Sequence, residues 1–273
     1  MSIILSSKFI GKAAMELRNF SSNFPVISPQ HNHRRQTFHS AALPPISSST
    51  SNPNSFKEKK EIRVCVNRTC SKQGSREIFS VLADIAPPEI SVASCGCLGL
   101  CGAGPNLVLL PTEVLVRHCG TANRAAEVLA RVCGKEFDPE RNLEALSLRK
   151  RGEVELVEKR DFHQAQILLS QAIGLNPSGG LHIIYTSRSV ARLGMGDMVG
   201  ALEDAKEASL LLPMFPKAYI CEGDVYMATG NYAAAKEAYS TALKCDPTIR
   251  RSKSFKVRIA KFDAAVSSTQ STE

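Results

Sequence analysis

Small residues and prolines recur at fixed intervals in the second half of the chain, and this recurrence constrains the fold more than any other feature. Three alanines are each followed by another alanine seven residues later and by a proline twelve residues later. The three sets are Ala165, Ala172 and Pro177; Ala201, Ala208 and Pro213; and Ala235, Ala242 and Pro247. Successive sets lie 36 and 34 residues apart. Small side chains let paired helices approach closely and a proline ends the second helix, so the pattern predicts stacked helix pairs, an all-α solenoid.

The period and the residue types resemble the tetratricopeptide repeat, a helix-turn-helix unit of about 34 residues. The third copy fits best, although Tyr219 replaces the consensus Trp and Glu222 the consensus Leu. The first copy fits least, because it has one inserted residue near Arg160 and Leu169 in the aromatic position. A helical bundle with accidental periodicity is the alternative.

The resemblance implies three repeats over residues 142–247. A single helix pair cannot bury its apolar face, so we expect residues 248–266 to form a capping helix. Residues 267–273 are expected to be a disordered tail.

Residues 1–57 have a different composition from the rest. They hold six basic residues and one acidic residue, which is +5 of the formal +8 of the chain. Stretches such as "LPPISSSTSNPNSF" bury too little apolar area to offset chain entropy, so we expect disorder. The bias toward Ser and against acids is typical of a transit peptide and favours a chloroplast over a mitochondrion, with an ordinary disordered tail as the alternative. Because most of the charge lies here, it does not indicate a nucleic-acid partner.

Residues 60–135 read as a compact domain that mixes strands and helices. "IRVCV" (62–66) and "EISVAS" (89–94) are predicted strands, and residues 106–118 a hairpin. Helices are predicted at 75–86, with Ser75 as N-cap, and at 121–134, with Thr121 as N-cap. This order suits one mixed sheet, and the polar stretch 134–142 marks the boundary with the repeats.

Four cysteines of this domain form two pairs, each following a predicted strand. Cys65 and Cys70 are separated by four residues, and Cys97 and Cys101 by three. Neighbouring strand ends would bring the four thiols together. Structural disulfides are uncommon in a reducing compartment, which favours a metal. Zinc knuckles generally have shorter gaps, so the spacing leans toward a two-iron cluster while leaving zinc open.

The run "CVNRTC…SREIFSVL…SCGCLGLCGAGPNLVLLP" resembles the thioredoxin-like [2Fe-2S] ferredoxins, a family that includes a subunit of respiratory complex I and hydrogenase modules. The resemblance covers about residues 62–134 and is most specific in "CLGLCGAGPNLVLL". It implies an α+β, thioredoxin-like fold for residues 60–135. It also implies that a [2Fe-2S] cluster is held by Cys65, Cys70, Cys97 and Cys101.

The other five cysteines fall outside the family pattern. Cys95 precedes the second pair by two residues; we expect a small buried residue, with a substitute ligand or a redox partner as alternatives. Cys119 and Cys133 are expected to be buried small residues, and Cys221 and Cys245 to pack within the repeats.

Tetratricopeptide domains mostly bind peptides or helices along the face lined by the first helix of each pair. The groove positions expected here are Lys150, Val154, Ile183, Thr186, Val190, Leu193, Lys217, Ile220, Asp224 and Met227. A clamp for an acidic C-terminus, as in chaperone-binding members, is rejected. Arg149 and Lys217 suit it, but Glu153, Ser187 and Cys221 replace the other clamp residues, and Glu153 would repel a carboxylate. We expect an apolar-faced helix as the occupant, with the final helix of the chain as the alternative.

No nucleophile–base arrangement, carboxylate dyad or phosphate loop is evident, and His118, His163 and His182 are expected at the surface. The sequence therefore predicts a non-enzymatic chloroplast [2Fe-2S] protein of the stroma. Its repeats would dock a protein partner, and it would act as a one-electron carrier or a redox-responsive scaffold. Assembly or maintenance of a photosynthetic complex, with peripheral thylakoid association, is the suggested setting. The alternatives are a dithiol oxidoreductase using Cys95, Cys97 and Cys101, and a zinc-stabilised adaptor.

Overall fold

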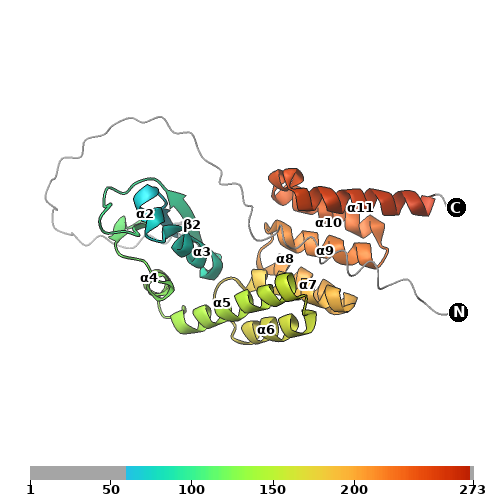
Figure 1. Cartoon of the computed structure of the whole chain (residues 1–273), viewed down its shortest axis with the longest axis horizontal. Helices are drawn as coiled ribbons and strands as arrows, with labels where there is room; N and C mark the ends of the chain where they lie inside the picture. The colour runs from blue at the N-terminus through green and yellow to red at the C-terminus, as the bar shows by residue number, and fades with distance from the viewer. Residues whose placement is uncertain (1–59, 271–273) are drawn as a thin grey trace, which may run out of the picture.

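The computed structural model describes residues 60–270, and Figure 1 shows a mixed domain followed by a stack of helices. The predicted transit segment, residues 1–57, lies outside the described residues. Within residues 60–270, no helix combines the length and apolar content that crossing a bilayer requires.

The first domain has one four-stranded sheet in the order β2-β1-β3-β4. Strands β1 (Lys60–Cys65) and β2 (Ile90–Cys95) pair in parallel, with Cys65 opposite Cys95. Strands β3 (Leu107–Leu110) and β4 (Val114–Val116) form the predicted hairpin, and β3 is antiparallel to β1. The prediction of a mixed sheet is therefore confirmed.

Three helices complete this domain. They are α2 (Arg68–Lys72), α3 (Ser75–Ile85) and α4 (Ala122–Cys133). The Thr121 side chain accepts a bond from the Arg124 N–H, which confirms the predicted cap of α4. The predicted cap of α3 is wrong: Gly74 is the N-cap and Ser75 is buried as the first helical residue, because a left-handed residue there lets the chain turn sharply out of α2. Helix α2 was not expected from the sequence.

Three antiparallel helix pairs follow. Their bounds are α5 (Pro139–Val154) with α6 (Phe162–Gly174), α7 (Leu181–Met195) with α8 (Met198–Leu211), and α9 (Pro216–Ala228) with α10 (Tyr232–Cys245). The periodicity of the alanines and prolines thus corresponds to real helix pairs.

The one-residue insertion in the first copy has a structural counterpart. Helix α5 runs into a π-helical turn, η2 (Glu155–Lys159), and Arg160 follows with a φ of 58°. A π-turn absorbs one extra residue without breaking the helix. The first pair therefore keeps its packing in spite of the longer sequence.

The same small-residue contact holds two of the pairs together. A Cβ added at Gly152 would lie 2.9 Å from Leu169 Cγ, and one added at Gly223 would collide with the Tyr239 ring. Gly152 and Leu169 occupy the same places in the first pair as Gly223 and Tyr239 in the third. The helices approach closely because a hydrogen atom stands where a side chain would clash.

The last pair is covered by the C-terminal helix. After a 3₁₀ turn, η3 (Pro247–Arg251), helix α11 (Lys253–Gln270) stacks on α9 and α10 (Figure 1). Phe255 and Phe262 contact Tyr239 edge-on at 6.0 and 6.5 Å between ring centroids. The helix continues past residue 266, so residues 267–270, expected in the tail, are helical.

The sheet domain and the first helix pair share part of their hydrophobic core, and the segment that connects them is short. Only residues 134–138 lie between α4 and α5, and Phe137 is buried with Leu146 of α5 in the core of the sheet domain. The Ser178 hydroxyl donates to the Glu136 carbonyl at 3.2 Å, and Gly179 N–H donates to Asn142 Oδ1 at 3.3 Å. Phe137, the one aromatic residue of the predicted boundary 134–142, thus anchors the repeats to the sheet.

Candidate functional site

The two cysteine pairs lie at neighbouring strand ends, as their spacing predicted. Cys65 ends β1, and Cys70 follows on α2. Cys97 and Cys101 lie in the loop after β2, which ends at Cys95 beside Cys65. The parallel pairing of β1 and β2 brings these two loops to one edge of the sheet.

The second pair is the more accessible of the two. Cys97 Sγ lies 3.4 Å from Cys101 Sγ, and both side chains are exposed, whereas Cys65 and Cys70 are buried. Two thiolates on one tetrahedral metal at about 2.3 Å would be about 3.8 Å apart, so Cys97 and Cys101 are already spaced as two ligands of one ion. Within residues 60–270, no group of three or more Cys, His, Asp or Glu side chains is placed to hold a single ion. Cys97 and Cys101 are therefore the two predicted ligands whose thiols lie close together in the structure.

Hydrogen bonds in the loop after β2 shift the pKa values of Cys97 and Cys101 in opposite directions. Gly99 N–H donates to Cys97 Sγ at 3.4 Å, and this bond, with a smaller one from Cys101, lowers the pKa of Cys97. The bond with Cys97 raises the pKa of Cys101. Burial, followed by the bond with Cys65, raises the pKa of Cys70. Cys97 is thus the thiol most readily ionised in this pair.

Cys95 is half-buried beside Cys65, which differs from the full burial expected. Burial, and then the proximity of Cys65, raise its pKa to about 11. Cys119 is buried as predicted, and Cys133 is half-buried against the same core. Cys221 is buried and Cys245 half-buried within the repeats.

Asn106 is a site residue that the sequence reading missed. It is 1% exposed, and its Nδ2 donates to the Leu100 carbonyl at 2.7 Å and lies 3.7 Å from Cys70 Sγ. A single amide therefore links the loop of Cys101 to the thiol of Cys70. Its position directly before the buried strand β3, in "GPNLV", was the available signal, because a polar residue there must find buried partners.

Gly104 explains how the two loops come so close. A Cβ added there would lie 2.8 Å from Cys70 Sγ and would also meet the Gln73 side chain. Any larger residue would push the two loops apart. The glycine is needed for close approach between loops.

The predicted groove residues are only partly exposed to solvent. Thr186 and Ile220 are buried, and the Asp224 carboxylate accepts bonds from Arg258 Nε at 2.9 Å and from Tyr239 Oη at 2.8 Å. Arg258 belongs to α11, so the final helix takes up the third-repeat end of the groove. That occupant was the stated alternative. Asp224 and Ile220 are therefore corrected from groove residues to packing residues, because the solenoid needs its last apolar face covered. Thr186 is corrected for another reason: it is buried on α7, and its carbonyl accepts a bond from Cys221 Sγ of α9 at 3.8 Å, so it packs between the second and third pairs.

The remaining predicted groove residues lie on α5, α7 and α9. Ile183, Val190, Leu193, Lys217 and Met227 are half-buried, and Lys150 and Val154 are exposed. Met227 packs on the cluster around Phe255. Apart from Met227, the apolar residues of this face that keep some solvent exposure are thus Val154 of α5 and the half-buried residues of α7.

His182 was expected at the surface, and the structure contradicts this. Its ring contacts Phe215 edge-on at 4.7 Å between centroids. Burial, then Arg149 and Lys217, lower its pKa to about 4. It is therefore neutral at physiological pH, because two cations and a poorly solvated position disfavour its charge. His118 and His163 are exposed, as predicted.

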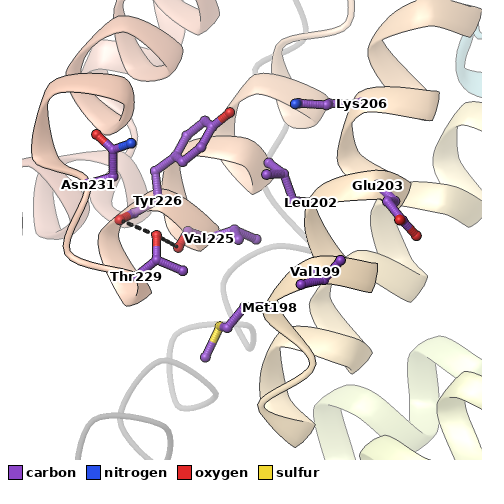
Figure 2. Close-up of a pocket in the computed structure, with 9 residues that line it drawn as sticks. All are labelled: Met198, Val199, Leu202, Glu203, Lys206, Val225, Tyr226, Thr229 and Asn231. Carbon is purple, nitrogen blue, oxygen red and sulfur yellow. Dashed lines mark hydrogen bonds between the residues drawn. The ribbon is translucent and has the colours of Figure 1, made fainter.

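A separate hollow of about 260 Å³ lies between α8 and α9 (Figure 2). Its lining is mainly apolar and includes Met198, Leu202 and Tyr226, with Val199 71% exposed at its rim. None of the predicted groove residues lines it.

Comparison with known proteins identifies a family for the helical part of the chain. The tetratricopeptide repeat family model matches residues 216–249, the third helix pair. The helical region of this chain contains tetratricopeptide repeats. Human tetratricopeptide repeat protein 28 is 34% identical over 108 residues, which is 40% of this chain and 4% of that protein. The STIP1 homolog of Dictyostelium discoideum is 36% identical over 89 residues, 33% of this chain and 15% of that protein. The chain thus spans a small part of these relatives.

Two solved structures overlap about half of the chain. The Sgt2 TPR domain from Aspergillus fumigatus has a TM-score of 0.42 at 22% identity, over 49% of this chain and 83% of that one. The first TPR of Spaghetti (RPAP3), solved bound to the HSP90 peptide SRMEEVD, has a TM-score of 0.41 at 20% identity, over 49% and 99%.

Proposed function

We propose that the chain is an iron–sulfur docking protein. A [2Fe-2S] cluster would be held by Cys65, Cys70, Cys97 and Cys101, while the repeats bind a protein partner. The observation that carries the proposal is the convergence of two thiol pairs at the adjacent ends of β1 and β2, with Cys97 and Cys101 already 3.4 Å apart. The cluster would supply one-electron redox chemistry, as a carrier or as a redox-responsive switch.

The four cysteines and Gly99 would have different roles around the cluster. Cys65 and Cys70 are buried, so they would anchor it against the sheet. Cys97 and Cys101 are exposed, so their side is the one that a redox partner can reach. The Gly99 N–H, directed at Cys97 Sγ, would stabilise added negative charge and so favour the reduced state.

The partner of the repeats is proposed to be a segment that folds as an apolar-faced helix. Half-buried Ile183 and Val190 on α7 offer the apolar surface, and α11 already shows that this solenoid accepts a helix at its end. The Ser-rich, acid-poor residues 1–57 support a chloroplast location, with assembly of a photosynthetic complex and thylakoid association as the proposed setting.

A dithiol oxidoreductase is a second candidate, favoured by the close and exposed pair Cys97 and Cys101. The Cys97 thiolate would attack a disulfide of the partner and release one partner thiol. Cys101 would then displace the second partner thiol, leaving a Cys97–Cys101 disulfide and a reduced partner. The lowered pKa of Cys97 suits the attacking role.

One preparation separates these candidates. The full chain, purified without oxygen, is expected to be brown, with two irons and two acid-labile sulfides per chain. Cys97→Ser and Cys101→Ser should each lose the colour, and Cys245→Ser, which removes a thiol from the repeats, should keep it. A colourless chain that contains zinc would identify the zinc-stabilised adaptor. A colourless, metal-free chain with a reducible Cys97–Cys101 disulfide would identify the oxidoreductase.

A further inference from the structure

A buried ionic cluster lies where the sheet domain meets the groove of the repeats. Arg149 on α5 is 93% buried, and its Nη2 lies 2.8 Å from Asp84 Oδ2. Its Nη1 donates to Glu153 Oε1 at 2.9 Å, and the Ser187 hydroxyl donates to the same oxygen at 3.3 Å. Asp84 comes from α3 of the sheet domain, and Arg149 and Glu153 come from the first repeat. A carboxylate of one domain is therefore bonded to a cation of the other.

Basic groups from α5 and α9 lie near Asp84 and Glu153. We call Arg149 and Lys150 of α5 and Lys217 of α9 the cationic end of the groove. Lys150 Nζ lies 3.8 Å from Asp84 Oδ2. Burial lowers the pKa of Lys217, and the nearby Glu153 and Asp84 act in the opposite direction. His182 is held neutral, so three cations face two carboxylates.

The position of Asp84 is fixed by the backbone and not only by its charge. A Cβ added at Gly179 would collide with the Ile85 carbonyl, and one added at Gly180 would collide with the Asp84 carbonyl. Gly180 has a φ of 74° and is the N-cap of α7. The end of α3 is thus seated against the start of α7, where two glycines make room for it.

We propose that the cationic end of the groove is an acidic-ligand site whose resident ligand is the chain's own Asp84, so that the groove excludes acidic peptides. This rests on the proposed role of the groove in docking a partner, and it specifies the chemistry of that partner. An acidic segment entering here meets Asp84 and Glu153, which repel it and already occupy the cations. An apolar helix over Ile183 and Val190 meets no such obstacle. Selectivity arises from the repulsive carboxylates as much as from attraction.

Binding of an acidic peptide to the full chain tests the proposal. The probe is a fluorescein-labelled peptide ending in Glu-Glu-Asp with a free carboxyl terminus, measured by fluorescence anisotropy at low and high salt. The variants are Asp84→Asn, Glu153→Gln and the double variant. Both substitutions keep the size and one acceptor oxygen of each side chain, so Arg149 is not left without a partner.

The wild-type chain should bind the probe weakly, and the double variant at least ~10-fold more tightly, with the gain lost at high salt. Adding Lys217→Met to the double variant should remove the gain. Asp263→Asn, which removes an exposed acid on α11, is the matched control and should change nothing. A glutamine-substituted probe should bind all variants equally.

Two results would overturn the proposal. One is a wild-type chain that binds the probe as tightly as the double variant. The other is a double variant that gains nothing while its circular dichroism and melting temperature match the wild type. The iron content of each variant reports separately on the cysteine site, so either result leaves the cluster proposal intact.

Discussion

In both the sheet domain and the repeats, glycine allows two segments to approach closely, but the contacts have different roles. In the repeats, Gly223 lets two helices of the third pair touch, and the same contact recurs at Gly152 in the first pair. In the sheet domain, Gly104 lets two loops touch at Cys70, and no other glycine within residues 60–270 makes this contact. A repeated contact serves stability and is visible as a period in the sequence. A contact that occurs once serves a site and becomes visible only when the loops have been placed.

The largest effect is expected in the repeats, where a buried carboxylate holds two arginines. Asp204 is 2% exposed; its oxygens lie 2.7 Å from Arg188 Nη2 and 3.2 Å from Arg192 Nη1. Asp204→Ala should lower the free energy of unfolding by about 3–5 kcal/mol, because two poorly solvated guanidinium groups lose their anion. Urea unfolding followed by circular dichroism measures it. Glu203→Ala, at the exposed neighbouring position, should stay within about 0.5 kcal/mol, and equal losses in both would contradict the expectation.

A smaller loss is expected from filling the helix–helix contact of the third repeat. Gly223→Ala should cost about 2–3 kcal/mol, because the new methyl group would meet the Tyr239 ring. Gly174→Ala is the matched control, since a Cβ there meets nothing within 4 Å. It should be neutral or slightly stabilising. A Gly223→Ala chain as stable as wild type would show that the repeated contact is not a source of stability.

Acid should weaken the junction between the two regions through His182. Its pKa is about 4 in the folded chain against an ordinary 6.5. The unfolded chain therefore takes up a proton first, and the contribution is complete above pH 6.5 and lost as pH falls toward 4. Allowing for partial exposure, the loss is on the order of 2 kcal/mol. Urea unfolding at pH 7.5 and pH 5 should show a smaller pH dependence in His182→Gln than in wild type; identical slopes would rule the effect out.

The smallest effect on stability, and the most local, is expected at Asn106. Asn106→Ala should cost about 1–2 kcal/mol, because the Leu100 carbonyl loses its donor. Amide hydrogen exchange should accelerate in residues 96–105 and remain unchanged in α9 and α10. Asn176→Ala, in the loop between α6 and α7, is the control and should leave residues 96–105 protected. Acceleration throughout the repeats in Asn106→Ala would mean that the site and the solenoid are not separable in the way that their sequences suggest.

The sequence reading was most accurate where contacts are local or periodic. The strand ending at Cys65, the N-cap at Thr121 and the helix pairs marked by their alanines and prolines all follow from neighbours along the chain. It failed at His182 and Asp224, because their surroundings come from elements far away in sequence. The bond between Asp224 and Arg258 spans 34 residues. The sequence around Asp224 contains no pattern that predicts its contact with Arg258.

The sequence by itself determined the helix pairs and the position of two cysteine pairs, each directly after a strand. These depend on side-chain size and spacing, which are written along the chain. Only the tertiary structure decided that Phe137 joins the two cores, that Asn106 ties the cysteine loops together, and that Asp84 reaches Arg149. Each of these is a buried contact between residues brought together by packing, and its energy depends on the loss of water around both partners at once. The order of residues along the chain does not show which distant residues will be buried against each other.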